Sequence, residues 1–290
     1  MIDYYLLEEL VTFADTKTLA KTAEKLMVTQ PTITRGMQKL EDELGVQLFH
    51  RQPNRIELTK TGQEAVRGAR KLLADNQQFV TNLRNYDNSH QQINIATVAP
   101  GPIFVARQVQ LADTPVKIES KFVHQQDIPS LLTNHKFSLI FTNQEIQTDD
   151  IESIFIGQER LSVNLDQFMY LANQQSVTFK ELEGLSFVVL EDIGPWKDVI
   201  QEHIPNAKFL YQAQRDALAE ITRYSNFPYF NTNITSLNPP ENAQLEDNDR
   251  VTIPITDPAA TMTFYAAYLK SDRKRLQPVI KQLAKKWPKI

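Results

Sequence analysis

The sequence predicts an α+β fold of several domains: an N-terminal winged helix-turn-helix, a long linker helix and a two-lobed α/β region. Three observations support this fold class. The chain has 290 residues, more than one domain usually holds. Apolar residues recur at helical spacing up to about residue 90, and short β-rich runs then alternate with amphipathic segments. No proline lies between Pro53 and Pro100, so residues 60–86 can form one long helix.

Composition indicates a globular chain and excludes several classes of site. Apolar residues make up 41% and charged residues 23% of the sequence. The absence of cysteine excludes a disulfide framework, a thiolate zinc site, an Fe–S cluster and a cysteine nucleophile. There is no run of about 18 apolar residues, and the acidic N-terminus lacks the lysines of a secretion signal. We therefore expect a cytoplasmic protein with no membrane partner.

Residues 19–44 have the pattern of a helix-turn-helix. Thr29 is placed to cap the second helix, and Gly45 to end it. Apolar residues of this helix recur at spacings of 4, 3 and 4, and they are Ile33, Met37, Leu40 and Leu44. If this stripe faces the core, the residues left free to face a partner are Gln30, Pro31, Thr32, Arg35, Gln38 and Lys39.

These exposed residue types suit the major groove of DNA. Gln and Arg can read adenine and guanine edges, whereas Thr and Lys suit phosphates. The turn Pro53-Asn54 joins two short extended runs, which predicts a wing whose tip carries Arg51, Asn54 and Arg55. The alternative is that all of these are solvated surface side chains.

The long helix carries an apolar stripe that alternates between spacings of 3 and 4, as in a coiled coil. The capping box Thr61–Glu64 is expected to open it. A rod of about 40 Å cannot bury such a stripe in a small domain, so we expect it to pair with a second copy of the chain. The predicted dimer seam consists of Val66, Ala69, Leu73, Val80 and Leu83. Packing of the helix on its own chain is the alternative.

Downstream of residue 92, alternating strands and helices predict a mainly parallel sheet with helices on both faces, divided into two lobes. The expected strands are Ile93–Thr97, Val116–Val123, Phe137–Phe141, Leu161–Leu165, Phe187–Leu190, Lys208–Tyr211, Val251–Ile255 and Thr263–Leu269. The expected helices lie near 102–112, 128–134, 195–204, 214–224 and 271–287. Ligands of such sheets bind beyond the carboxyl ends of the strands. The candidate small-molecule site is therefore Thr97, Val98, Pro100, His124, Gln125, Thr142 and Asn143.

Three of these side chains are expected to supply the polar contacts. Pro100 and Pro102 remove two backbone donors, which leaves the imidazole of His124 and the hydroxyls of Thr97 and Thr142. The alternative is an empty cleft lined by ordinary loop residues.

The inventory of catalytic motifs argues against an enzyme. The five histidines are scattered without metal-ligand spacing. Neither a nucleophile elbow, nor a phosphate loop, nor a dinucleotide fingerprint occurs in the sequence. We expect no catalytic residue, no metal and no cofactor.

Residues 3–65 resemble the DNA-binding domain of LysR-type transcriptional regulators. The resemblance rests on Thr18–Arg35, on Leu40–Arg51 and on the segment Leu58-Thr59-Lys60-Thr61-Gly62. It implies a DNA-binding domain over 1–58, a linker helix over 59–88 and an effector domain over 91–290 that resembles periplasmic binding proteins. In that domain, lobe I would span about 91–161 and 267–290, and lobe II about 162–266. The DNA contacts of the family map onto Thr29, Gln30, Pro31, Thr32, Arg35, Arg51 and Arg55.

The same resemblance implies partners: operator DNA, a small-molecule effector between the lobes, further copies in a dimer or tetramer, and RNA polymerase. The effector region departs from the family pattern. Ser138 stands where an aspartate is common, and Ser225–Phe230 replaces a glycine-rich turn. Two alternatives follow, a regulator with a vestigial cleft controlled by protein contacts, or a small-molecule-binding protein of another class.

Overall fold

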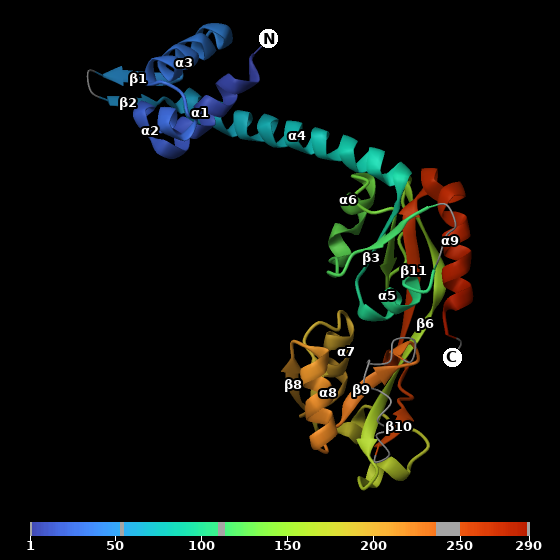
Figure 1. The fold of residues 1–290 in the computed structure, drawn as a ribbon. Coiled ribbons are helices and arrows are strands. Elements are labelled where there is room, and N and C mark those ends of the chain that lie inside the picture. Colours follow the sequence, from blue (N-terminus) through green and yellow to red (C-terminus); the bar gives the residue numbers. More distant parts are fainter. Residues whose placement is uncertain (1, 53–54, 110–113, 236–249, 289–290) are drawn as a thin grey trace. The chain divides into compact units, whose positions relative to one another are not determined.

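The computed structural model describes residues 2–52, 55–109, 114–235 and 250–288, and its contacts divide the chain into two units (Figure 1). Unit 1 is Met1–Arg84 and unit 2 is Asn85–Ile290. Helix α4 (Lys60–Gln91) contributes to both units, so the division falls inside this helix. No helix in the described ranges is long and apolar enough to cross a membrane.

Unit 1 is a winged helix-turn-helix. Its elements are α1 (Tyr4–Thr16), α2 (Leu19–Lys25), α3 (Gln30–Leu44), β1 (Phe49–Gln52) and β2 (Arg55–Leu58). The predicted caps of α3 are confirmed: the Thr29 hydroxyl accepts the backbone N–H of Thr32, and Gly45 adopts φ 68° at the other end. Ile33, Met37 and Leu40 are fully buried, so the polar face of α3 is directed outward.

Helix α4 begins at Lys60, one residue before the expected capping box, and Thr59 caps it. The Thr59 hydroxyl accepts the backbone N–H of Gly62 at 2.9 Å and donates to the carbonyl of Gln47 at 3.0 Å. Val66 and Ala69 are buried in the core of unit 1. The first turns of α4 are therefore part of the winged domain, and these two residues are not available to a second chain.

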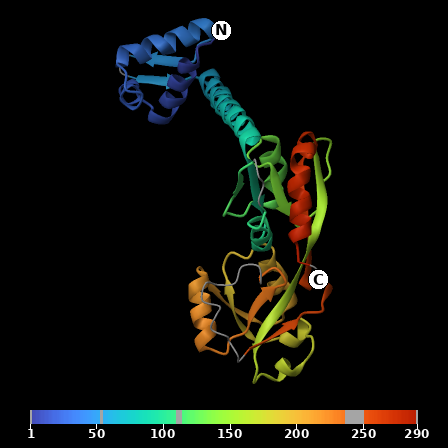
Figure 2. The same ribbon diagram turned by 45° about the vertical axis from the view of Figure 1, so that its right-hand side comes forward.

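Unit 2 contains two groups of elements, which Figures 1 and 2 show from two sides. The first group is β3 (Ile93–Thr97), α5 (Pro100–Ala106), β4 (Val116–Ile118), α6 (Ile128–Thr133), β5 (Leu139–Thr142) and α9 (Arg273–Lys286). The second group is β7 (Ser186–Leu190), α7 (Trp196–His203), β8 (Lys208–Gln212), α8 (Arg215–Tyr224), β9 (Tyr229–Thr232) and β10 (Arg250–Pro254). Two strands, β6 (Ile151–Asp166) and β11 (Thr261–Leu269), complete the sheet. Short 3-10 turns occur at Gln125–Asp127, Tyr170–Asn173, Lys180–Leu182, Pro258–Ala260 and Lys270–Asp272.

The large sheet is mixed, so the expectation of a mainly parallel sheet is wrong. Its strand order is β10-β6-β11-β5-β3-β4, and β9 also pairs with β6. Only the pairs of β3 with β4 and with β5 are parallel in this sheet, whereas every pair that involves β6 or β11 is antiparallel. A separate parallel pair, β7 with β8, lies in lobe II. The strand predicted at Leu161–Leu165 is the second half of the 16-residue β6.

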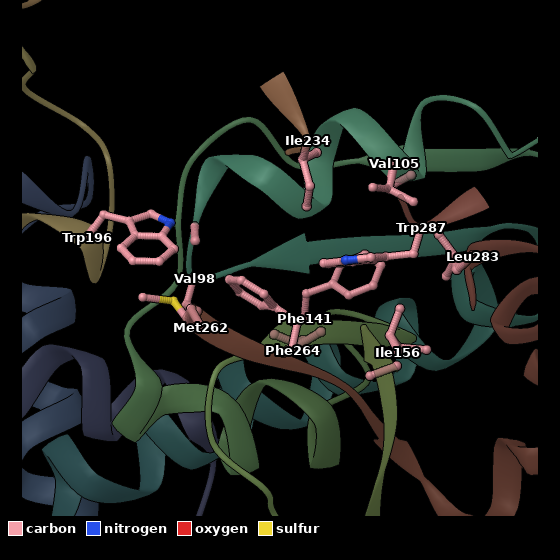
Figure 3. Packing of buried hydrophobic residues seen from close by; sticks show 14 of the residues in the cluster. Val98, Val105, Phe141, Ile156, Trp196, Ile234, Met262, Phe264, Leu283 and Trp287 are labelled. Carbon is pink, nitrogen blue, oxygen red and sulfur yellow. The ribbon is translucent and has the colours of Figure 1, made fainter. Parts of the chain in front are cut away.

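Strand β6 passes from one lobe into the other. Its first half pairs with β11, and its second half lies between β9 and β10. The register with β11 shifts between Phe264 and Tyr265, close to Gly157. The indole of Trp287 occupies the space beside Gly157, where an added Cβ would lie 2.3 Å from its ring, and its N–H donates to the carbonyl of Gln158 at 2.8 Å. Figure 3 shows Trp287 near Phe264 and Phe141 in the same core.

Candidate nucleic-acid interface and inter-lobe site

The start of α3 presents the predicted DNA-reading residues together. All five are exposed, and they are Thr29, Gln30, Pro31, Thr32 and Arg35. The Thr29 and Thr32 hydroxyls lie 2.8 Å apart, and Pro31 occupies the first turn, where a backbone N–H is not needed. Within the described ranges Arg35 has no ion-pair partner, so its guanidinium is free to meet a base or a phosphate.

A groove of about 520 Å³ separates the start of α3 from the wing. Gln30 and Thr34 line one side, and Arg51 and Arg55 line the other. Lys17, at the end of α1, adds a third cation. The fold thus brings the predicted wing arginines within reach of the partner that α3 would read. Asn54, the third predicted wing residue, lies outside the described residues.

Both wing arginines form ion pairs, Arg51 with Glu41 of α3 and Arg55 with Glu57 of β2. Arg51 Nη1 lies 2.6 Å from Glu41 Oε2, and the other oxygen of Glu41 accepts the backbone N–H groups of Leu48 and Phe49 at 2.7 and 2.9 Å. This carboxylate therefore fixes both the first wing strand and its arginine. Arg55 pairs with Glu57 at 2.5 Å, and both side chains are more than half exposed.

Lys39, which sequence reasoning placed on the outer face of α3, is held by α1. Its ammonium lies 2.5 Å from Asp3 and over the ring of Tyr5. The hydrogen bond and the charge of Lys39 lower the pKa of Asp3, and the same hydrogen bond raises the pKa of Lys39. Lys39 therefore joins α3 to Asp3 and to the first turn of α1.

Glu9 of α1 is a buried carboxyl that packs on the recognition helix. Its side chain is 5% exposed, and its Oε2 has no hydrogen-bond partner among the described residues. It fills the space over Gly36, where an added Cβ would lie 1.8 Å from that oxygen. Burial raises the pKa of Glu9 to about 6.

The predicted effector residues are only partly brought together. A hollow of about 610 Å³ at the carboxyl ends of β4 and β5 is lined by His124, Gln125, Gln126, Pro129, Gln144 and Ile146. His124 and Gln125 belong to the predicted set. The buried Thr142 hydroxyl donates to Gln125 Oε1 at 2.8 Å and so orients that amide.

The remaining predicted effector residues do not line this hollow. Thr97 is 1% exposed, and its hydroxyl bonds to the backbone of Ala99 at 2.8 and 3.1 Å. Val98 is buried as well, Pro100 begins α5, and Asn143 is half-buried. The Thr97 hydroxyl is therefore bound by the backbone of the turn after β3 and does not line this hollow.

Sequence reasoning missed the polar cluster at the junction of the two lobes. Glu159 of β6 is 2% exposed, and it accepts hydrogen bonds from Trp196 of α7 and Thr232 of β9. The sequence does indicate that Glu159 is buried, because it alternates with Leu161, Val163 and Leu165 on the same face of the strand. The described residues include no group of three or more His, Asp or Glu side chains placed to hold a metal ion.

Comparison with known proteins agrees with this geometry. The family described as bacterial regulatory helix-turn-helix protein, lysR family, matches residues 5–63. The regulator DgcR of a Pseudoalteromonas species is 24% identical over 206 residues, 65% of this chain and 68% of the relative. The regulator HdfR of Escherichia coli is 24% identical over 212 residues, 70% of each chain.

The fold of the whole chain also has a counterpart among solved structures. Full-length OxyR from Pseudomonas aeruginosa superimposes with a TM-score of 0.50 at 20% identity, covering 99% of this chain and 94% of that one. A winged helix-turn-helix is therefore followed in both chains by a linker helix and a two-lobed α/β region. Residues 5–63 are thus a helix-turn-helix of the lysR type, and over about two thirds of its length the chain is similar to DNA-binding transcriptional regulators.

Proposed function

We propose that this regulator reads DNA bases with Gln30 and Arg35 and holds the backbone with the wing, as a dimer joined through α4, and that it has no catalytic activity. The exposed start of α3 beside the arginine-lined groove carries the proposal. A recognition helix enters the major groove with its N-terminal residues foremost, which is where these side chains lie. Thr29 and Thr32 are proposed to bind phosphate oxygens next to them.

The two wing arginines are proposed to differ in role. Arg55 and Glu57 form an exposed pair, and such pairs contribute little to stability, so a phosphate can displace the carboxylate at low cost. Arg51 is bound to a carboxylate whose side chain is only 10% exposed, which also holds two backbone N–H groups. Arg51 therefore presents its remaining donors from a fixed position.

A stripe on α4 that remains exposed is proposed as the dimer seam. Leu72, Phe79 and Leu83 are 55, 61 and 53% exposed, and their spacings of 7 and 4 repeat as in a coiled coil. Of the seam predicted from the sequence, Val80 and Leu83 remain part of the proposed dimer contact, whereas Val66 and Ala69 are buried in unit 1. Leu73 is half-buried, and its carbonyl accepts the Tyr4 hydroxyl, so we assign it to the same unit. Large apolar side chains exposed in a row favour association with a second copy.

The hollow beside His124 is proposed as the effector site. Its volume of about 610 Å³ suits a small metabolite, and amides, an imidazole and Ile146 line it. A ligand held there would contact the ends of β4 and β5 and the start of α6. Such a ligand regulates DNA binding only if it prefers one arrangement of the chain over another. RNA polymerase, a tetrameric assembly and a cytoplasmic location follow the pattern of the family and belong to the same proposal.

Fluorescence anisotropy with a DNA site selected from a random pool tests the base-reading proposal. Gln30→Ala and Arg35→Ala should each lose about 1–3 kcal/mol on the selected site and little on random DNA. Gln77→Ala is the matched control, because it removes the same exposed amide from α4, outside α3 and the wing. Equal losses of Gln30→Ala and Arg35→Ala on both DNAs would contradict base reading and make these residues phosphate contacts.

A further inference from the structure

The junction between the two lobes is filled by a carboxyl group of the chain itself. Glu159 extends from β6 at the place where this strand leaves the pairing with β11 and enters the pairing with β9. Its side chain is 2% exposed and reaches the turn that follows β3. That turn, Thr97–Gly101, lies beyond the carboxyl end of a parallel strand, where open α/β sheets bind their ligands.

Both carboxyl oxygens of Glu159 are bound by donors from lobe II. The indole N–H of Trp196 donates to Oε2 at 3.1 Å, and the Thr232 hydroxyl donates to Oε1 at 2.7 Å. Trp196 is 3% exposed, so its donor is shielded from water. Burial raises the pKa of Glu159, because the charged form loses its hydration while only neutral donors replace it. These contacts give each oxygen of the carboxyl group one hydrogen-bond donor.

Lobe I closes on this carboxyl from the other side. A Cβ added to Gly101 would lie 2.5 and 2.6 Å from the two oxygens of Glu159, so the glycine leaves room for them. Gly194, just before Trp196, approaches the same turn: an added Cβ there would lie 2.4 Å from the carbonyl oxygen of Val98. Figure 3 shows Trp196 at the same end of the apolar cluster as Val98 and Met262.

We propose that Glu159 is a built-in ligand of the inter-lobe site: the site recognises a carboxyl group, and the chain supplies that group from β6. Donors of lobe II bind the carboxyl and the turn of lobe I packs over it, which is the arrangement expected around a bound small acid. The parent protein then holds its lobes together without a free acid. Effectors would then bind in the hollow beside His124, which is lined by other residues. An effect of Glu159 on DNA binding rests on the proposed function. The binding of the Glu159 carboxyl by both lobes does not.

Replacement of the missing group by acetate tests the proposal. Glu159→Ala removes the atoms of one acetic acid molecule and leaves the indole N–H, the Thr232 hydroxyl and Gly101 in place. Thermal unfolding of the full chain is followed in sodium acetate and in sodium chloride of equal ionic strength. We expect the melting temperature of Glu159→Ala to fall by about 5–10 °C in chloride. Acetate should restore at least half of that loss, with a saturable dependence on its concentration.

The parent and Glu159→Gln are the matched controls, and neither should respond to acetate more than to chloride. A Glu159→Ala protein that acetate does not stabilise would overturn the proposal, as would an equal saturable response of the parent. If Glu159→Ala does not fold in either salt, Glu159→Ser, which also lacks the terminal CH2–COO group, is tested with acetate and judged by the same criterion. DNA affinity is measured in the same samples. Rescue of stability without any change in DNA affinity would leave the built-in ligand intact and contradict only its regulatory role.

Discussion

The buried carboxyl of Glu9 makes the stability of the winged domain depend on pH. Its oxygen lies against Gly36 in the middle of the recognition helix, with no hydrogen-bond partner among the described residues. Replacement of Glu9 by Gln keeps the shape of the side chain and removes its charge at every pH. The variant therefore isolates the free energy of holding a charge at the contact between α1 and α3.

The sign and the size of the effect follow from the two pKa values. Glu9 has a pKa of about 6 in the folded chain against an ordinary value of 4.5. Since the folded pKa is raised, the stabilising contribution is full below pH 4.5 and is lost as the pH rises through 6. One pH unit between the two values corresponds to about 1.4 kcal/mol, so the parent loses about 2 kcal/mol between pH 4 and pH 7.5. The Gln variant does not lose this amount.

Hydrogen exchange measured by mass spectrometry gives the opening free energy of α1 and α3 at each pH in the full chain. The stability of Glu9→Gln relative to the parent should rise by about 2 kcal/mol from pH 4 to pH 7.5. Glu8→Gln, at the exposed neighbouring position, controls for loss of a carboxylate and should give a flat difference. A flat difference for Glu9→Gln as well would refute the reasoning, because it would mean that the carboxylate is solvated or paired in solution.

Three further predictions concern the same unit and its helix. Gly36→Ala should destabilise unit 1 in urea unfolding, because the added Cβ meets the Glu9 carboxyl. In a Glu9→Ala background the same substitution should stabilise unit 1 by about 1 kcal/mol through helix propensity. An effect of the same sign in both backgrounds would disprove the contact. Arg55→Ala should reduce the slope of log affinity against log salt by about one on any DNA, and an unchanged slope would remove Arg55 from the phosphate contacts. Phe79→Asp combined with Leu83→Asp should shift the mass measured by light scattering to that of a monomer, and a native mass would reject the α4 seam.

The winged domain could be predicted from the sequence because its signals are local. The Thr29 cap, the stripe of Ile33, Met37 and Leu40, and Gly45 all lie within one helix and its ends. The path of β6 could not be predicted in this way. The bulge near Gly157 changes the phase of the strand, so residues 151–160 show no steady alternation of buried and exposed side chains. Strand direction also depends on partners far along the chain, and β11 joins β6 from a hundred residues away.

The same difference between local and long-range signals explains which candidate sites could be predicted. The recognition helix was identified by residue type and exposure, which the sequence pattern carries. The candidate effector residues were chosen only because they follow the ends of predicted strands. In the structure, the hydroxyl of Thr97 forms its hydrogen bonds with the backbone of Ala99 in the turn after β3. Glu159 was missed because a single glutamate in a strand is usually a surface residue, and only the fold brings Trp196 and Thr232 to it.

The passage of β6 through both lobes determines how the effector region can move. A lobe that turned about this strand would twist its backbone near Gly157, where the Trp287 indole is hydrogen-bonded to the next carbonyl. Trp287, the residue that ends α9, thereby joins this helix to the strand that runs through both lobes.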